Sequence, residues 1–202
     1  MIFLKRENLL CNILVDMEEN NICSNCALRL YNTKSYNLQG VGNPYKGNVI
    51  VVPNVDYKAY KGKSMDFSTQ VEIIEDVLHL STGVEESNFY VVPLIRCNEQ
   101  ISCEVDYATY NRCLQYFAQD VRKYNFKNIL LLGNTARRFL NINIHEYLDT
   151  VIVSKNNRRY FVNYSPFVKN IDETLFNTFR DSLTKWHNSV NTGFYDYSIK
   201  TI

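Results

Sequence analysis

The chain has 202 residues, enough for one compact domain with a full hydrophobic core. Apolar residues make up 46% and charged residues 21%, and the net charge of +1 excludes a globally basic protein, so nucleic-acid binding would need a local basic patch. Six cysteines without a secretory signal predict an intracellular setting, cytoplasmic or nucleoid-associated, and no membrane is expected because the apolar runs are too short to span one.

The N-terminal part combines a predicted helix with two closely spaced cysteines. Apolar residues from Leu9 to Met17 recur at helical spacing and predict a helix over residues 4–18. Cys23-Ser24-Asn25-Cys26 follows, and two thiols three positions apart in an intracellular protein usually hold a metal or carry out redox chemistry. A polar, irregular stretch leads from there to residue 48.

Short apolar runs alternate with helical patterns through the rest of the chain. Continuous apolar runs are typical of parallel strands buried on both faces, and they predict strands at 49–52, 89–92, 129–132, 150–153 and 159–163, the second halted by Pro93. Helical spacing predicts helices at 68–80, 105–124, 136–140 and 172–187. We therefore expect an α/β fold of three layers, α/β/α, with a mostly parallel central sheet of about four strands. Residues 1–187 are expected to form this single domain, and 188–202 a loosely attached tail.

Ligands of such sheets bind outside the carboxyl ends of the strands. This rule directs attention to the loops at 53–57, 93–97 and 165–169. Gly133, Asn134 and Thr135 open a predicted helix and are a possible phosphate contact. Arg137-Arg138 and the group Lys155, Arg158 and Arg159 are local basic clusters, which more often are solvated surface than binding sites.

Four cysteines lie in three separated segments of this pattern. Cys23 and Cys26 form the N-terminal pair, Cys97 follows a predicted strand, and Cys113 lies in a predicted helix. Four thiolates suit a zinc site or an iron–sulfur cluster, and their spacing does not choose between the two. The alternative is that these are ordinary buried cysteines.

Taken together, the pattern resembles the uracil-DNA glycosylase superfamily, most closely the family 4 type that carries a [4Fe–4S] cluster. The similarity covers roughly residues 20–185. It is carried by the four cysteines, Val49–Val52, Gly62, Gly83-Val84, Phe89–Val92, Leu94–Cys97, Ile129–Ala136 and Val162–Pro166. The resemblance implies that Cys23, Cys26, Cys97 and Cys113 ligate a mainly structural cluster, with Cys103 as a possible substitute ligand. Cys11 fits core packing of the first helix.

The active-site motifs depart from the family pattern. Where the family has Gly-Glu-x-Pro-Gly, this chain has Pro53-Asn54-Val55-Asp56-Tyr57, so Asn54 replaces the acidic residue and Asp56 is the nearest carboxylate. Met65 stands in place of the phenylalanine that stacks on uracil, and Pro93 in place of the asparagine that reads its edge. Ser165-Pro166 replaces His-Pro, and losing one such electrostatic contact typically costs about 2.7–4 kcal/mol of transition-state stabilisation.

The resemblance therefore predicts an iron–sulfur protein that binds DNA, or a protein partner in replication, repair or transcription, and has lost uracil excision. DNA contacts are expected at Gly133, Asn134, Thr135, Pro166 and Lys169. One alternative is an active DNA glycosylase of altered base specificity that uses Asn54, Asp56 and Ser165. Another is a zinc-stabilised protein-interaction domain. The three histidines, His79, His145 and His187, are expected to be surface or half-buried structural residues.

Overall fold

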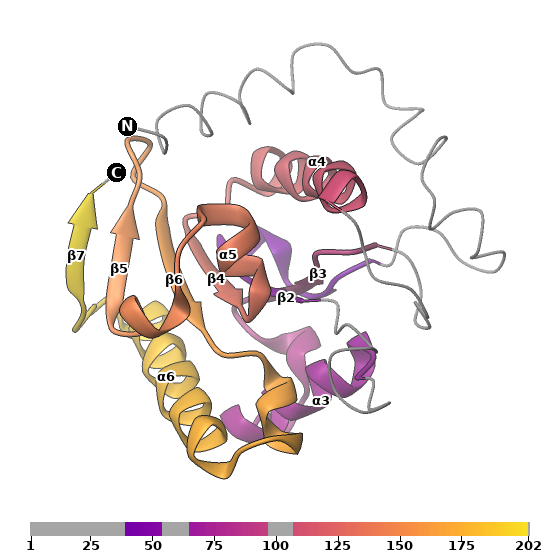
Figure 1. The fold of residues 1–202 in the computed structure, drawn as a ribbon, viewed down its shortest axis with the longest axis vertical. Helices are drawn as coiled ribbons and strands as arrows, with labels where there is room; N and C mark the ends of the chain where they lie inside the picture. Colours follow the sequence, from indigo (N-terminus) through magenta and orange to yellow (C-terminus); the bar gives the residue numbers. More distant parts are fainter. Residues whose placement is uncertain (1–38, 54–64, 97–106, 202) are drawn as a thin grey trace, which may run out of the picture.

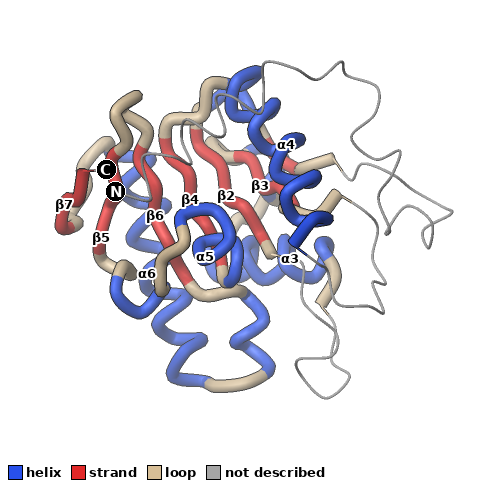
Figure 2. Tube along the Cα trace, turned by 45° about the horizontal axis from the view of Figure 1, so that its top comes forward, coloured by secondary structure: helices blue, strands red, loops and turns tan. Residues whose placement is uncertain are grey.

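A computed structural model describes residues 39–53, 65–96 and 107–201 of the chain. Within these ranges a mixed sheet of seven strands has the order β1-β3-β2-β4-β6-β5-β7 (Figures 1 and 2). The strands are β1 (Val41–Gly42), β2 (Asn48–Val52), β3 (Tyr90–Pro93), β4 (Asn128–Leu132), β5 (Thr150–Val153), β6 (Arg159–Asn163) and β7 (Ser198–Thr201). The helices are α3 (Phe67–Leu78), α4 (Tyr107–Tyr124), α5 (Asn134–Leu140) and α6 (Glu173–Thr192), with short 3-10 helices η1 (Pro44–Lys46), η3 (Val84–Glu86), η4 (Ile144–Glu146) and η5 (Pro166–Asn170).

The α/β class is as expected, but the sheet has more strands than the four expected. β3, β2, β4 and β6 are neighbours and run parallel, while β1 pairs antiparallel with β3 and β5 antiparallel with β6. β7 pairs parallel with β5 at the outer edge. Sequence patterns missed β1 because it has two residues, and β7 because all four of its residues are exposed and show no apolar alternation.

The central strands are buried on both faces, which is why they are continuous apolar runs. Alternate residues such as Val49 and Val51 face α4 and α5, in a cluster that includes Phe117 and Leu140. Ile50 and Val52 face the other way, towards α3 and α6. The sheet is thus covered by α4 and α5 on one face and by α3 and α6 on the other (Figure 2).

Pro93 is the last residue of β3 rather than the residue that halts it. Its position is paired with Val52 in the parallel register, but the next backbone N–H, that of Leu94, donates to the Val52 carbonyl oxygen at 3.0 Å. β1 pairs with Tyr90 and Val91, so none of the described strands requires an N–H at position 93. A proline is tolerated here for that reason.

The last helix is longer than predicted, and the segment after it belongs to the sheet. The N-cap of α6 is Asp172, whose side chain accepts from the Leu175 N–H at 2.9 Å, and its C-cap is Gly193, which is left-handed with φ of 73°. The helix passes through 188–192, where Ser189 and Thr192 hydroxyls bond to carbonyls four residues earlier. The boundary expected at residue 187 therefore falls inside α6, and residues 198–201 form β7 rather than a loose tail.

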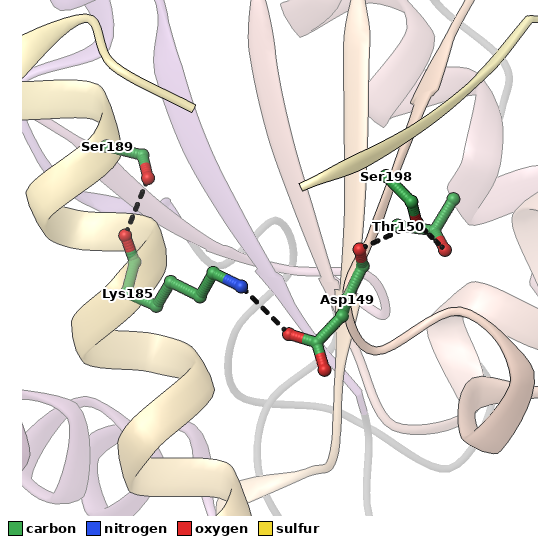
Figure 3. Close-up of polar contacts among 5 residues, drawn as sticks. All are labelled: Asp149, Thr150, Lys185, Ser189 and Ser198. Carbon is green, nitrogen blue, oxygen red and sulfur yellow. Dashed lines mark hydrogen bonds and ion pairs between the residues drawn. The ribbon is translucent and has the colours of Figure 1, made fainter. Parts of the chain in front are cut away.

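Two tyrosines hold the C-terminal segment on the fold. The rings of Tyr195 and Tyr197 lie 5.8 Å and 5.1 Å from the ring of Phe161, centroid to centroid. Burial raises the pKa of the Tyr197 phenol. Figure 3 shows the polar contacts nearby: Ser198 donates to the Asp149 carbonyl oxygen at 3.0 Å, and Lys185 pairs with the exposed Asp149 carboxylate at 3.0 Å. Exposed pairs contribute little, so the aromatic contacts carry most of the attachment.

None of the helices in the described ranges is both long enough and apolar enough to cross a membrane.

Candidate functional site

The carboxyl ends of β2, β3, β4 and β6 meet around Pro53. The N–H of Leu94, just after β3, donates to the carbonyl oxygen of Val52, the last residue of β2. A methyl group built on Gly133, just after β4, would lie 2.8 Å from Ser165 Cβ and 3.3 Å from Pro53 Cγ. The described parts of the four predicted ligand-binding loops are therefore in contact or adjacent, and β6 leads from this point into η5 and α6 (Figure 1).

The opening of α5 offers few free donors. Gly133 has φ of 56° and ψ of −136°, and its N–H donates to the Asn163 carbonyl oxygen at 2.8 Å. Thr135 is fully buried and its hydroxyl donates to the Leu132 carbonyl oxygen at 2.7 Å. Only Asn134 of the three predicted phosphate contacts is exposed, and its amide donates to the Tyr110 hydroxyl at 3.4 Å. The fold thus uses Gly133 and Thr135 internally.

Ser165 caps η5 and is half-buried beside Gly133. Its hydroxyl oxygen accepts from the Phe167 N–H at 3.2 Å, and a serine oxygen that accepts still has its own hydrogen to donate. Pro166 is buried, whereas Lys169, at the end of the same 3-10 helix, is exposed. Of the predicted DNA contacts here, Lys169 is the one that faces solvent.

Asn163 fixes the direction in which the chain leaves β6. It is fully buried, its amide nitrogen donates to the Phe179 carbonyl oxygen of α6 at 2.9 Å, and its amide oxygen accepts from the Tyr164 N–H at 2.8 Å. Both polar ends of the side chain are satisfied. Asn163 therefore positions the Ser165 segment against α6.

Gln70 is a polar residue of this region that sequence reasoning did not single out. It is 2% exposed on the inner face of α3, and its amide nitrogen donates to the Pro53 carbonyl oxygen at 3.1 Å, with the Met65 and Asp66 carbonyls close by. Three carbonyls around the nitrogen fix the orientation of the amide, and its buried oxygen has no hydrogen-bond partner among the residues that the structure describes. In the sequence, the sign of this buried polar residue was a glutamine next to Val71 and Ile74 on the apolar face of a predicted helix.

Most of the predicted cluster ligands lie outside the described residues. Cys23, Cys26 and Cys97, together with Cys11 and Cys103, fall in ranges that the structure does not describe. Cys113 lies on α4, 3% exposed, in the cluster that also contains Leu94 and Ile95. Among the described residues, no three histidine, cysteine or acidic side chains are close enough to hold a metal ion.

Asn54 and Asp56, two of the three predicted catalytic residues, also lie outside the described residues. Met65, in place of the stacking phenylalanine, is buried, and Phe67 is half-buried at the start of α3. Pro93 is buried within β3.

The three histidines are exposed or half-buried, as predicted. His79 is the left-handed C-cap of α3. His145 is exposed, but its Nδ1 lies 2.6 Å from the Tyr164 hydroxyl, so this histidine is hydrogen-bonded to the residue before Ser165. His187, on α6, packs edge-on against Phe89 with ring centroids 5.7 Å apart, and Asn191 Nδ2 lies 3.1 Å from its Nε2.

The environment of His187 predicts a pH dependence of stability. Burial lowers its pKa below the usual 6.5, and Asn191, whose amide oxygen is taken by Asn88, donates to Nε2 of the neutral ring. The unfolded chain then binds the proton more readily, so the free energy of unfolding is highest above pH 6.5 and falls as the pH drops through that value. Urea unfolding over this range should show a smaller fall for His187→Gln. His79→Asn controls for the loss of a histidine, and an unchanged slope in His187→Gln would contradict the prediction.

No protein-family model matches the chain, and no curated protein sequence matches it.

Proposed function

We propose that the chain is a uracil-DNA glycosylase-like iron–sulfur protein that binds DNA at the carboxyl ends of its central strands and has lost uracil excision. The observation that carries the proposal is the meeting of the loops after β2, β4 and β6, where Pro53, Gly133 and Ser165 are in direct reach of one another. These are the positions that correspond to the glycosylase motifs named above. Four neighbouring parallel strands with helices on both faces are compatible with such a body.

The proposed [4Fe–4S] cluster is ligated by Cys23, Cys26, Cys97 and Cys113. Bound there, it would link three segments that are far apart in the sequence. Support comes from the segment that leads into Cys97. Arg96 is 4% exposed and forms an ion pair with Asp120 of α4, the helix that carries Cys113. The chain just before Cys97 thus lies against the helix of the fourth proposed ligand. A zinc ion held by the same thiolates is the alternative.

Loss of excision follows from the residues at the strand ends. Catalysis in the family depends on an acidic residue, an amide that reads the base and a histidine that stabilises the leaving base. Asn54, Pro93 and Ser165 stand at those positions. A neutral serine supplies a hydrogen bond but no positive charge, so Ser165 cannot replace the electrostatic role of the histidine.

DNA contact in this proposal falls to exposed groups around the same strand ends. Asn134, Arg137 and Lys169 are exposed on α5 and η5, and Ser165 and Pro53 both lie against Gly133, which precedes α5. The backbone amides at the start of α5 are not part of the proposed DNA contact. The helix has only seven residues, and the N–H of Gly133 already donates to the Asn163 carbonyl oxygen. Affinity carried by such side chains falls as salt is raised.

A second candidate is an active glycosylase of altered specificity. The observation that favours it is the amide oxygen of Gln70 beside Pro53, which is buried and has no donor within the described ranges, because such an acceptor could take a hydrogen bond from a ligand. In this candidate Asn54 or Asp56 organises water and Ser165 contacts the leaving base.

Anaerobic purification with metal analysis tests the proposal. We expect a brown protein with about four iron atoms per chain. The iron should be lost in each of the variants Cys23→Ser, Cys26→Ser, Cys97→Ser and Cys113→Ser. The matched control, Cys11→Ser, should retain it. The iron protein should bind duplex DNA in a salt-dependent manner and leave uracil-containing strands intact after alkali treatment.

Other outcomes separate the alternatives. A colourless protein with zinc would contradict the iron–sulfur assignment, and iron that survives removal of Cys113 would contradict that ligand. Release of any base from a panel of damaged duplexes, reduced by Asn54→Ala or Asp56→Ala, would replace the proposal by the active-enzyme candidate.

A further inference from the structure

The amino ends of the strands, opposite the proposed DNA face, gather cations from three separate segments. Lys127 precedes β4, and its N–H donates to the Gly47 carbonyl oxygen at 2.7 Å, just after Lys46. Arg159, at the start of β6, donates its N–H to the Lys127 carbonyl oxygen at 2.8 Å. The pairing of β2 with β4 and of β4 with β6 therefore places Lys46, Lys127 and Arg159 at one edge of the sheet, with the Arg159 guanidinium over the Tyr195 ring.

The turn between β5 and β6 lies at this same end of the sheet, at the top of the view in Figure 1. Lys155 and Arg158 belong to that turn, which is closed by the Ser154 N–H on the Arg158 carbonyl oxygen at 2.9 Å. Lys46, Lys127 and Lys155 are exposed. Lys123, at the end of α4, is exposed beside them and lies 5.0 Å from the ring centroid of Tyr124.

These cations are not neutralised within the described part of the chain. Its ion pairs are Arg96 with Asp120 and Lys185 with Asp149, and neither involves this edge. Arg158 is half-buried, and its guanidinium takes part in neither of these ion pairs.

An exposed aromatic ring lies within the same surface. Tyr45 of η1 is 78% exposed, although the ring is held edge-on against Tyr124 at a centroid distance of 5.4 Å. It is next to Lys46 in the chain. A fixed ring with a free face beside lysines is the arrangement on which unpaired bases stack while the lysines contact the phosphates.

We propose that the amino-end surface formed by Tyr45, Lys46, Lys123, Lys127, Lys155 and Arg158 binds single-stranded nucleic acid. The phosphates lie along the cations and a base stacks on Tyr45. η3, which leads into β3, carries the exposed Glu85 and Glu86 and limits the surface on that side. The surface is at the end of the sheet opposite Ser165, so it is a second nucleic-acid contact that does not depend on the proposed function.

The test measures binding of a fluorescein-labelled oligothymidylate by anisotropy as salt is varied. Lys46→Ser/Lys127→Ser should weaken binding and make the slope of log K against log salt shallower by about 1.4, because each phosphate contact on a single strand contributes about 0.7. Tyr45→Ala should weaken binding roughly 5-fold or more at every salt concentration, and Tyr45→Phe should retain it, since stacking needs the ring alone.

The matched control is Arg180→Ser/Lys200→Ser, which removes the same charge from exposed positions on α6 and β7. Absence of oligothymidylate binding, or equal weakening by this control, would overturn the proposal. Duplex bound as tightly as the single strand, with no effect of Tyr45→Ala, would also overturn it. A protein without iron, or without affinity for duplex DNA, would contradict the proposed function and leave this surface standing.

Discussion

Replacing Gly133 by alanine is expected to lower the free energy of unfolding by about 2–4 kcal/mol, because backbone strain and overpacking each cost about 1–3 kcal/mol. The backbone at Gly133 has φ of 56° and ψ of −136°, a combination outside the regions open to L-residues. The added methyl group would lie 2.8 Å from Ser165 Cβ, which cannot move without its backbone. Urea unfolding followed by circular dichroism measures the effect.

Gly193→Ala is the matched control for this change. Gly193 also has a positive φ, 73°, but a methyl group there meets nothing within 4 Å. The free energy of unfolding of Gly193→Ala should fall by about 1 kcal/mol, because only the left-handed backbone conformation disfavours alanine there. Equal losses in the two variants would show that the contact among Pro53, Gly133 and Ser165 has no energetic weight, and would remove the main support for a built site at the strand ends.

Deleting residues 194–202 is expected to destabilise the protein by about 3–5 kcal/mol, since two half-buried tyrosines and their ring contacts are lost together. The deletion takes Tyr195 and Tyr197 off Phe161. It also removes the Tyr195 hydroxyl from Asn128, to which it donates at 3.2 Å, and the strand that pairs with β5. Thermal and urea unfolding of the shortened chain give the comparison.

Two substitutions inside the full-length chain isolate the cause. Tyr195→Ala/Tyr197→Ala should reproduce most of the loss. Phe194→Ala/Ile199→Ala, which changes side chains that are 73% and 74% exposed, should stay within about 0.5 kcal/mol of the parent. If the exposed pair mattered as much as the tyrosines, the attachment of β7 would have a different origin.

The sequence predicted the elements whose formation depends on hydrophobic burial. Strands 49–52 and 129–132 are predictable because both faces are covered, which leaves a continuous apolar run. The two outer strands, β1 and β7, depend on backbone pairing to a neighbour, and nothing in their own residues encodes that neighbour. Tyr195 and Tyr197, two positions apart, were the available sign of an extended segment with one covered face.

The candidate site was predictable in position and less so in composition. Topology brings the ends of β2, β4 and β6 together, so Gly133 and Ser165 could be placed by rule. Whether a side chain there faces solvent depends on packing, and Thr135 and Pro166 turned inward while Lys169 did not. The donor and acceptor balance at Gln70 depends on three carbonyls from the strand end and the start of α3, which residue spacing does not report.

The position of β7 also bears on how the protein is made. A ribosome delivers Tyr195, Tyr197 and β7 after every other described element, yet the two tyrosines pack on Phe161 of β6 and β7 pairs with β5. Until this segment has left the ribosome, the nascent body presents an uncovered aromatic face and a β5 that is paired with β6 on one edge only. Chaperone engagement at this face should end only when Tyr195, Tyr197 and β7 are free to pack on the body.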